Sequence, residues 1–513
     1  MKKLYRTVAF VTILSCAERF IGFIYRIFLS RYVGAEGLGL YQIALSVAGV
    51  VVTLTASGIP VTVSRLMIKE KSLKGGKAGA DVVTAGIIAA LAISIPVCMF
   101  LYFAKPLLSG FFADKRCYDV LVVMLPGIVL TSVYAVIRGF FWGNRYYGAY
   151  SVIELIEELS MFIAGVIIIT KTRDAFSSAI GAGQAVLISY VVSFIISTVT
   201  FVIKSGRVAN PVKQFRPLIC SASPITLTKT LTSLTGFLVA LVIPARLAAS
   251  GVSGAEATKS FGELTGMALP LLFIPSTIIG SIALVSLPEI SESYYSGNSE
   301  KLVSGVKTAF SFSIFVSALI IPIFISCGEE IGKFVYGNAQ AGRYLSVSAI
   351  IMLPMSASLI CCSVLNSLGK EKLTLLNFLA GAVCMFAAIW FLTAKIGIYS
   401  LIVGYGISYV VTALLDFFLT VKSLENKGGL KKSFLLTFVY VIPASVFACF
   451  LNGILSKVLS GFFLILTVGV ISAAFSFALL SIGGAIKINE LFPFLKNLKT
   501  KREKPRVSLD KAQ

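Results

Sequence analysis

The stretch VVTAGIIAALAISIPVCMFLYF, residues 82–103, has 22 residues and no charged side chain. As a helix it would rise about 33 Å, which matches the roughly 30 Å hydrocarbon core of a bilayer. Uncharged runs of similar length recur at residues 308–327 and 461–486. Charged residues make up only 13% of the chain, against about 25% in a typical soluble protein, so a soluble fold could not bury this much apolar surface. The sequence therefore predicts membrane-spanning helices.

Apolar runs of this kind follow one another and predict an all-α polytopic membrane protein with about fourteen transmembrane helices. The predicted spans are residues 7–33, 38–62, 79–103, 118–142, 149–170, 178–203, 217–245, 262–287, 303–327, 343–368, 373–394, 397–421, 433–455 and 459–486. The connections are short and no GxxxxGK[ST] loop occurs, so we expect neither a soluble catalytic domain nor an internal ATPase. The chain has no histidine, and we expect no metal site and no cofactor.

The net charge of +22 comes from basic residues that are distributed unevenly between the two sides of this topology. Of the 45 Lys and Arg residues, 30 fall on the side of the termini and 12 on the other side. The positive-inside rule then places both termini in the cytoplasm and the chain in the cytoplasmic membrane. Topology and contact with membrane lipids thus explain the charge, and we expect no nucleic-acid partner.

An internal repeat relates the two halves of the chain. The Leu-Pro pairs at 125–126 and 353–354 lie 228 positions apart, and each precedes a polar residue, Arg138 or Asn366, by the same interval. A shift of about six spans preserves orientation, as in the parallel repeats of many secondary transporters. We therefore predict two lobes of about six helices each, followed by two additional helices. The predicted parts are an N-lobe (1–203), a cytoplasmic linker (204–216), a C-lobe (217–421), two additional helices (433–486) and a basic cytoplasmic tail (487–513).

Two arginines lie deep inside the first predicted span. Arg19 is about 18 Å from the cytoplasmic end, near the bilayer midplane, and Arg26 follows on nearly the same helix face. Because an arginine facing lipid at this depth costs several kcal/mol, the stripe is expected to face a watery cavity or the bundle interior. Structural pairing with the adjacent Glu18 is the alternative, but one carboxylate cannot neutralise two guanidinium groups.

Lys229 occupies the same depth in the seventh predicted span, within the segment SPITLTKT (223–230). The proline and the hydroxyl side chains predict a bent or locally unwound helix there. Corresponding helices of the two halves thus each contribute a buried cation. A positively charged cavity favours anions such as a diphosphate. We assign diphosphate binding to Arg19, Arg26 and Lys229.

Carboxylates near the cytoplasmic end of the fifth predicted span are candidates for coupling or gating. Glu154, Glu157 and Glu158 share one helix face through their i, i+3 and i+4 spacing. With Glu18 and Arg138, which we assign to the same role, they could neutralise a cavity arginine, lock a gate or take up a proton. A solvated helix start explains Glu154 equally well.

Asp416 is the only acidic residue in the last few predicted spans. It is a further candidate for binding H⁺ or Na⁺, but its position near the cytoplasmic end favours simple exposure at the interface. Whether H⁺, Na⁺ or the membrane potential drives transport is left open.

The segments RFIGFIYR (19–26) and RYVGAEGLGLYQ (31–42) resemble the opening of polysaccharide and peptidoglycan precursor flippases of the multidrug/oligosaccharidyl-lipid/polysaccharide exporter superfamily. Three further segments, ATKSFGELTG (257–266), LPEIS (287–291) and IRGFF (137–141), resemble the stage V sporulation branch of that superfamily. The resemblance covers nearly the whole chain. It implies a two-lobed, MATE-like fold that moves an undecaprenyl-diphosphate-linked sugar between leaflets by alternating access.

The resemblance also carries over to single residues. Arg19 matches an essential cavity arginine of the related lipid II flippases, and their second cavity arginine falls on Tyr25, with Arg26 one position later. Their cationic residue in the eighth helix has no counterpart in residues 267–287, and Lys229 would replace it.

Residues and resemblance together predict a flippase, not an enzyme, for an undecaprenyl-diphosphate-linked oligosaccharide or a lipid II-like peptidoglycan precursor, used in spore cortex or cell-wall synthesis. Cell-wall synthesis enzymes are candidate partners. A cation-coupled multidrug antiporter of the same fold is the first alternative, which a cavity dominated by carboxylates would favour. A polytopic glycosyltransferase or polymerase is the second, and it would normally carry long acidic or His-containing outer loops.

Overall fold

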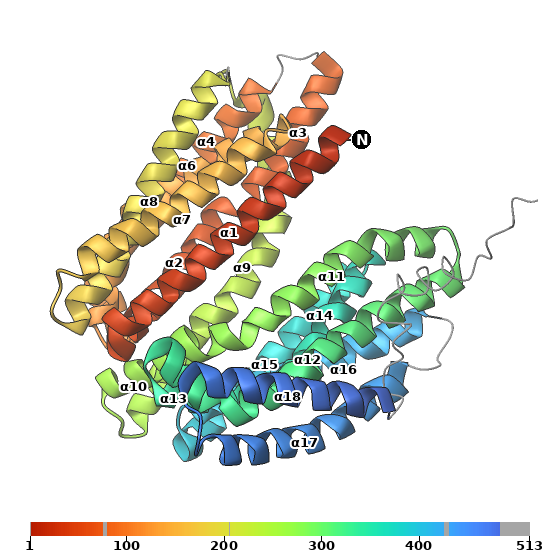
Figure 1. The fold of residues 1–513 in the computed structure, drawn as a ribbon. Helices are drawn as coiled ribbons and strands as arrows, with labels where there is room; N and C mark the ends of the chain where they lie inside the picture. Colours follow the sequence, from red (N-terminus) through yellow and green to blue (C-terminus); the bar gives the residue numbers. More distant parts are fainter. Residues whose placement is uncertain (1, 75–78, 205, 425–429, 483–513) are drawn as a thin grey trace, which may run out of the picture. The chain divides into compact units, whose positions relative to one another are not determined.

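The computed structural model describes residues 2–74, 79–204, 206–424 and 430–482, and these are almost entirely helical, with no strand among them (Figure 1). The α-helices are α1 (Lys2–Tyr32), α2 (Gly34–Ala56), α3 (Ile59–Lys74), α4 (Ala80–Phe103), α5 (Lys105–Leu108), α6 (Arg116–Gly143), α7 (Tyr147–Ile169), α8 (Ala175–Ile203), α9 (Val212–Ala249), α10 (Gly254–Phe261), α11 (Leu269–Tyr295), α12 (Ser299–Tyr336), α13 (Ala339–Ser348), α14 (Met352–Ser367), α15 (Glu371–Ile396), α16 (Tyr399–Ser423), α17 (Leu430–Leu455) and α18 (Gly461–Ile482). Three short segments, η1 (Ser109–Phe111), η2 (Gly262–Ala268) and η3 (Ala349–Ile351), join neighbouring helices. The predicted basic tail, 487–513, lies outside the described residues.

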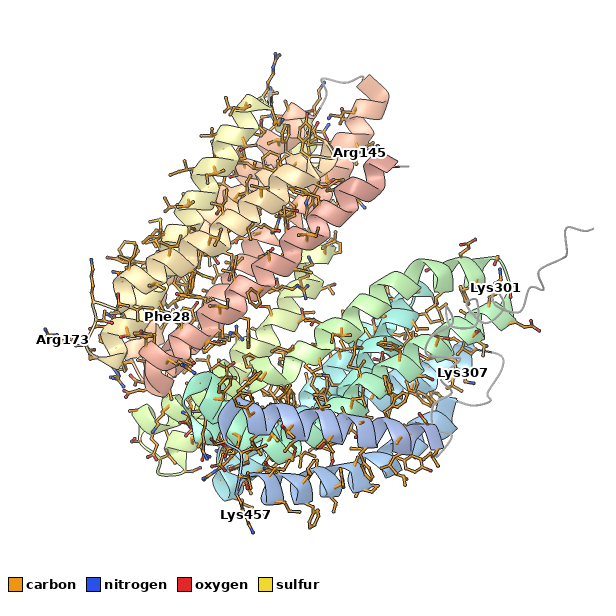
Figure 2. The ribbon with its side chains drawn as sticks, viewed as in Figure 1. Phe28, Arg145, Arg173, Lys301, Lys307 and Lys457 are labelled. Atoms are coloured by element: carbon orange, nitrogen blue, oxygen red, sulfur yellow. The ribbon has the colours of Figure 1, made fainter. Side chains whose placement is uncertain are left out.

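The helices have the length and polarity of membrane spans. Eleven helices or runs of adjoining helices in the described residues are long and apolar enough to cross a bilayer. Helices cover most of each predicted span, although the break between α2 and α3 lies inside 38–62 and residues 483–486 lie outside the described residues. Basic residues flank the helices, as Arg145 and Arg173 do at opposite ends of α7 in Figure 2. The all-α, multi-pass membrane fold is therefore confirmed, whereas the number of crossings and the side of the termini stay predictions.

Chain contacts divide the protein into two compact units. Unit 1 comprises Met1–Met267 with Trp390–Ile398, and unit 2 comprises Ala268–Ile389 with Tyr399–Gln513. The two lobes predicted from the internal repeat divide the chain at a different place, because α9 and α10 follow the predicted N-lobe but belong to unit 1. The lobes stay a prediction.

The end of α15 belongs to unit 1 because α9 holds it. Arg246 of α9 donates a hydrogen bond from Nη2 to the Trp390 carbonyl oxygen at 2.9 Å. Its guanidinium also lies 4.3 Å from the centre of the Trp390 ring, within the range of a cation–π interaction.

In unit 1, α6 packs against α2, α3, α4 and α8, and α7 lies between α1 and α8. α9 packs against α2, α3, α4 and α10. It runs without a break through Pro217, Pro224 and Pro244, so of the bent or locally unwound helix predicted around Lys229 the unwinding is wrong and the bend stays a prediction. Neighbouring helices and hydroxyl side chains can tolerate prolines inside a membrane helix.

Glycines permit the closest helix contacts around the start of α2. A methyl group at Gly39 would overlap the backbone carbonyl of Thr258 in α10, and one at Gly262 would lie 2.5 Å from the Gly39 nitrogen. Gly262 opens the π-helical segment η2, which contains the GELTG sequence. Small residues thus let two backbones touch, as is common between membrane helices.

We expect Gly39→Ala to destabilise the protein by about 1–3 kcal/mol, because the new methyl group meets backbone that cannot move aside like a flexible side chain. Thermal unfolding of the purified protein in detergent measures the change. Gly49→Ala is the matched control, since a methyl group on this glycine of the same helix would have no neighbouring atom within 4 Å. Equal effects of the two substitutions would contradict this account of the α2–α10 contact.

In unit 2, α12 is the central helix and packs against α11, α13, α14, α17 and α18. Asn452 of α17 donates a hydrogen bond to the Ser326 carbonyl oxygen of α12 at 2.7 Å. Asp416 of α16 is 0% exposed, so the expectation that it lies open at the interface is wrong. Proximity to the end of a helix does not ensure exposure, because α15 covers this position through Asn377.

Candidate functional site

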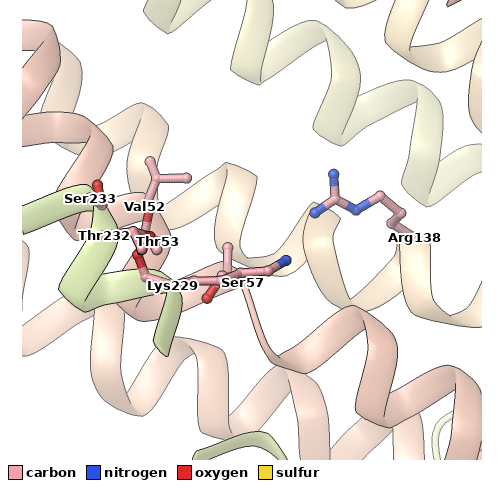
Figure 3. A pocket seen from close by; sticks show the side chains of 8 residues that line it. Val52, Thr53, Ser57, Arg138, Lys229, Thr232 and Ser233 are labelled. Atoms are coloured by element: carbon pink, nitrogen blue, oxygen red, sulfur yellow. Dashed lines mark hydrogen bonds between the residues drawn. The ribbon is translucent and has the colours of Figure 1, made fainter. Parts of the chain in front are cut away.

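A cavity of about 500 Å³ lies within unit 1 between α2, α6 and α9 (Figure 3). Its volume is in the range of small-molecule binding sites. Two cations contribute to its wall, Lys229 from α9 and Arg138 from α6, and Figure 3 shows both head groups pointing into the same space. The other lining residues are Val52, Thr53, Ala56, Ser57, Thr232 and Ser233.

The wall around Lys229 is polar because of helix periodicity. Lys229, Thr232 and Ser233 are spaced i, i+3 and i+4 and therefore share one face of α9. Across from them, α2 ends at Ala56, and Ser57 lies in the break before α3. The Ser57 hydroxyl oxygen is buried and has no hydrogen-bond partner among the described residues, so a ligand in the cavity could supply one.

Arg138 connects the cavity to a cluster of carboxylates. Its Nη1 lies 3.6 Å from Glu154 Oε1 of α7, and its guanidinium lies 5.5 Å from the Trp142 ring centre and 6.0 Å from that of Tyr150. The Tyr150 hydroxyl also hydrogen-bonds Glu154. Within the described structure, Arg138 Nε is buried without a partner. Arg138 is thus held by α7 and aromatic rings on one side and lines the cavity on the other.

Of the remaining carboxylates, Glu18 and Glu158 lie where α7 meets α1, whereas Glu157 faces Ser193 of α8. Glu158 Oε1 packs over Gly22, where a methyl group would lie 2.6 Å away, and this carboxylate interacts electrostatically with Glu18 and Arg26. Glu157 Oε2 is buried and unpartnered in the described part of the chain. The structure therefore brings together every residue assigned to coupling or gating: Glu18, Glu154, Glu157, Glu158 and Arg138.

The three residues assigned to diphosphate binding do not all line this cavity. Lys229 lines the cavity, but Arg19 and Arg26 do not. Arg19 is exposed on α1, and Arg26 is half-buried beside Glu158. Tyr25, which the resemblance aligned with a second cavity arginine, is 3% exposed and packs its ring edge-on against Phe162. That position therefore serves helix packing here.

Sequence reasoning missed the cavity hydroxyls. Thr232 and Ser233 were detectable, because they follow Lys229 at the spacing of one helix face. Thr53 and Ser57 were not, because nothing in the sequence indicates that the end of α2 lies against the middle of α9.

More than half of the chain matches a known protein family. Residues 4–294 match the family described as "Polysaccharide biosynthesis protein". The chain is 26% identical over 391 residues to Stage V sporulation protein B of Bacillus subtilis, covering 74% of this chain and 75% of that protein. It is 23% identical over 416 residues to Lipid II flippase MurJ of the same organism, covering 74% and 76%.

Solved structures show the same fold. A Lipid II flippase MurJ in an inward closed conformation superposes with a TM-score of 0.72 at 14% identity, covering 95% of this chain and 99% of that one. An inward-facing MATE multidrug resistance transporter superposes with a TM-score of 0.68 at 14% identity, covering 80% and 96%. At such identities the likeness shows the architecture alone.

Proposed function

Because this chain belongs to the polysaccharide biosynthesis protein family, we propose that it is a flippase that moves an undecaprenyl-diphosphate-linked oligosaccharide or a lipid II-like peptidoglycan precursor across the cytoplasmic membrane. Its relatives include a protein named as a lipid II flippase and one named for stage V of sporulation. We place its role in cell-wall or spore cortex synthesis on the same basis.

The observation that carries the proposal is the charge of the unit 1 cavity. Lys229 and Arg138 line it together with four hydroxyl side chains, and no carboxylate does so among the described residues. Ammonium, guanidinium and hydroxyl groups are hydrogen-bond donors that match the oxygens of a diphosphate. A cationic drug would meet two like charges there, which disfavours the antiporter alternative.

Arg138 provides a route from substrate binding to coupling. A diphosphate in the cavity competes with Glu154 for the same guanidinium, so substrate entry weakens the ion pair. Glu154 then lies among Glu18, Glu157 and Glu158 with less positive charge nearby, which favours uptake of a proton. When this proton is released after transport, Glu154 re-forms its ion pair with Arg138. The re-formed pair favours departure of the headgroup.

Arg19 and Arg26 are proposed to act from α1 at another stage of the cycle. The exposed Arg19 would meet the headgroup before or after the cavity does, and Arg26 would balance Glu158 when α1 and α7 move. In alternating access the binding site opens to one side of the membrane at a time, so the substrate would meet the α1 arginines and the cavity at different stages.

Vesicles that contain the purified full-length protein and a fluorescent undecaprenyl-diphosphate-linked sugar test the function. A membrane-impermeant quencher bleaches label in the outer leaflet only, so flipping increases the bleached fraction beyond that of protein-free vesicles. The same sugar on undecaprenyl monophosphate is the matched substrate, and we expect it to flip more slowly because it lacks one phosphate. Equal bleaching with and without protein would overturn the proposal, and accumulation of a cationic dye instead would support the antiporter.

A further inference from the structure

An apolar stripe runs from the surface of α4 into the connection between α4 and α6. Its members are Met99, Phe103, Leu107 and Phe111, which follow one another at intervals of four residues and are each more than half exposed. Residues four apart lie on the same helix face, and α5 continues the winding of α4 because the Leu108 N–H donates to the Ala104 carbonyl oxygen. The last two members of the stripe lie outside the predicted span 79–103.

Ion pairs fix this connection near both of its ends. Close to its start, Lys105 pairs with Asp119 in the first turn of α6. At its end, Arg116 Nη2 lies 2.6 Å from Glu36 Oε1 of α2 and 2.6 Å from Asp114 Oδ2. The chain between these two points is therefore held against the rest of unit 1.

Between the two ion pairs, the apolar side chains divide into an inner and an outer set. Phe112 belongs to the inner set, since it is half-buried and packs edge-on against Tyr118, with 5.9 Å between the ring centres. Leu107 and Phe111 form the outer set and are 67% and 62% exposed. The connection thus holds two large apolar side chains outward, although it is fixed to unit 1 on both sides of them.

The length of α4 places the outer set at the surface of the bilayer. α4 has 24 residues and rises about 36 Å, which already exceeds the roughly 30 Å of the hydrocarbon core. The residues that follow Phe103 therefore lie at the level of the lipid headgroups. Tyr102 is exposed at the same level, and tyrosine is enriched at membrane–water interfaces.

Continuity of the stripe indicates that its partner is lipid. Met99 and Phe103 are exposed on a helix that is long and apolar enough to cross a bilayer, so they face acyl chains. Leu107 and Phe111 extend that surface, and the single charged residue of α5 and η1, Lys105, is paired with α6. An apolar face without a charge that continues a lipid-facing surface is suited to the boundary between headgroups and acyl chains.

We propose that residues 103–111 form an interfacial anchor, which inserts Leu107 and Phe111 into the lipid leaflet at this end of unit 1. Through the Arg116 ion pair with Glu36, the anchor fixes the level of the starts of α6 and α2 relative to the bilayer. The proposal rests on the lipid-facing surface of unit 1 and uses no residue of the diphosphate cavity. It therefore goes beyond the flippase function and does not depend on it.

Tryptophan fluorescence of the full-length protein in vesicles tests the anchor. Leu107→Trp is reconstituted into phosphatidylcholine that is brominated on an acyl chain near the headgroup, and into the same lipid without bromine. Iodide is the water-soluble quencher. Lys171→Trp is the matched control, because it places the same indole in the exposed connection between α7 and α8 at the same end of unit 1. The emission of the native Trp142 and Trp390 is measured with the wild type and subtracted.

We expect the brominated lipid to lower the emission of the indole at position 107 by about twofold or more, because interfacial side chains reach the start of the acyl chains. Iodide should quench this indole less than the one at position 171, which should respond to iodide and not to bromine. Both variants carry the same indole, so its own preference for interfaces does not separate them.

Stronger quenching by iodide than by the brominated lipid at position 107 would overturn the proposal, because the connection would then project into water. Protection from both quenchers would also overturn it, since a protein surface such as a second copy of the chain would then cover the stripe. If Leu107→Trp does not fold, Phe111→Trp decides, because it replaces one exposed aromatic ring of the anchor with another and should be quenched by the same lipid.

Discussion

Replacing Lys229 by Ala is expected to slow flipping of the diphosphate-linked precursor by about tenfold to a hundredfold. A hydrogen bond to a charged group contributes about 1.5–3 kcal/mol, and each 1.4 kcal/mol corresponds to a factor of ten. Lys229 presents its ammonium to the cavity from the middle of α9, and Arg138 alone would then hold the headgroup. The vesicle quenching assay measures the rate at equal amounts of reconstituted protein.

Two further variants separate charge from position. Lys229→Arg keeps the cation and should retain most of the activity, because a guanidinium also donates to phosphate oxygens. Lys213→Ala removes an exposed lysine from the same helix, outside the cavity, and should flip like the wild type. If Lys229→Ala transported as fast as Lys213→Ala, the cavity would not be the place where the diphosphate is held.

The fold was largely predictable, because a bilayer imposes strong constraints on sequence. Apolar length, short polar connections and the placement of basic residues are local properties, and they located the long apolar helices. The separate helices α3, α5 and α10 were not predicted, and α12 extends to Tyr336, beyond the predicted end at 327. The pairing of helices was not predictable in this way. Contacts such as Gly39 against Thr258 depend on two surfaces far apart in the chain, and a glycine in an apolar run does not reveal its neighbour.

The candidate site was predictable only in its parts. Lys229 was selected by depth, and it lines the cavity. Depth did not reveal which surface each residue faces, and Arg19 and Arg26 of α1 do not line this cavity, so their contact with a diphosphate stays a prediction. Arg138 was assigned to coupling or gating, and the structure adds that it lies at the boundary between the carboxylates and the cavity.

Exchanging the charges of Arg138 and Glu154 is the change that distinguishes the two roles of this arginine. In the double variant Arg138→Glu/Glu154→Arg, opposite charges still face one another between α6 and α7, so a purely structural ion pair is restored. The cavity, however, then carries a carboxylate beside Lys229. We expect a folded protein whose flipping rate is lower than that of the wild type by about a hundredfold or more, because like charges brought together cost several kcal/mol.

The neutral double variant Arg138→Gln/Glu154→Gln serves as the reference for that exchange, since it removes the ion pair without placing a negative charge in the cavity. If Arg138 binds the diphosphate, the charge-exchanged protein should be slower than this neutral protein, although its ion pair is intact. If Arg138 only fastens α6 to α7, the order reverses and the exchanged protein recovers activity. The ranking of these two variants therefore decides whether the guanidinium acts on the substrate or on the helices. Thermal unfolding of both variants verifies that they are equally stable, so that the ranking reports transport.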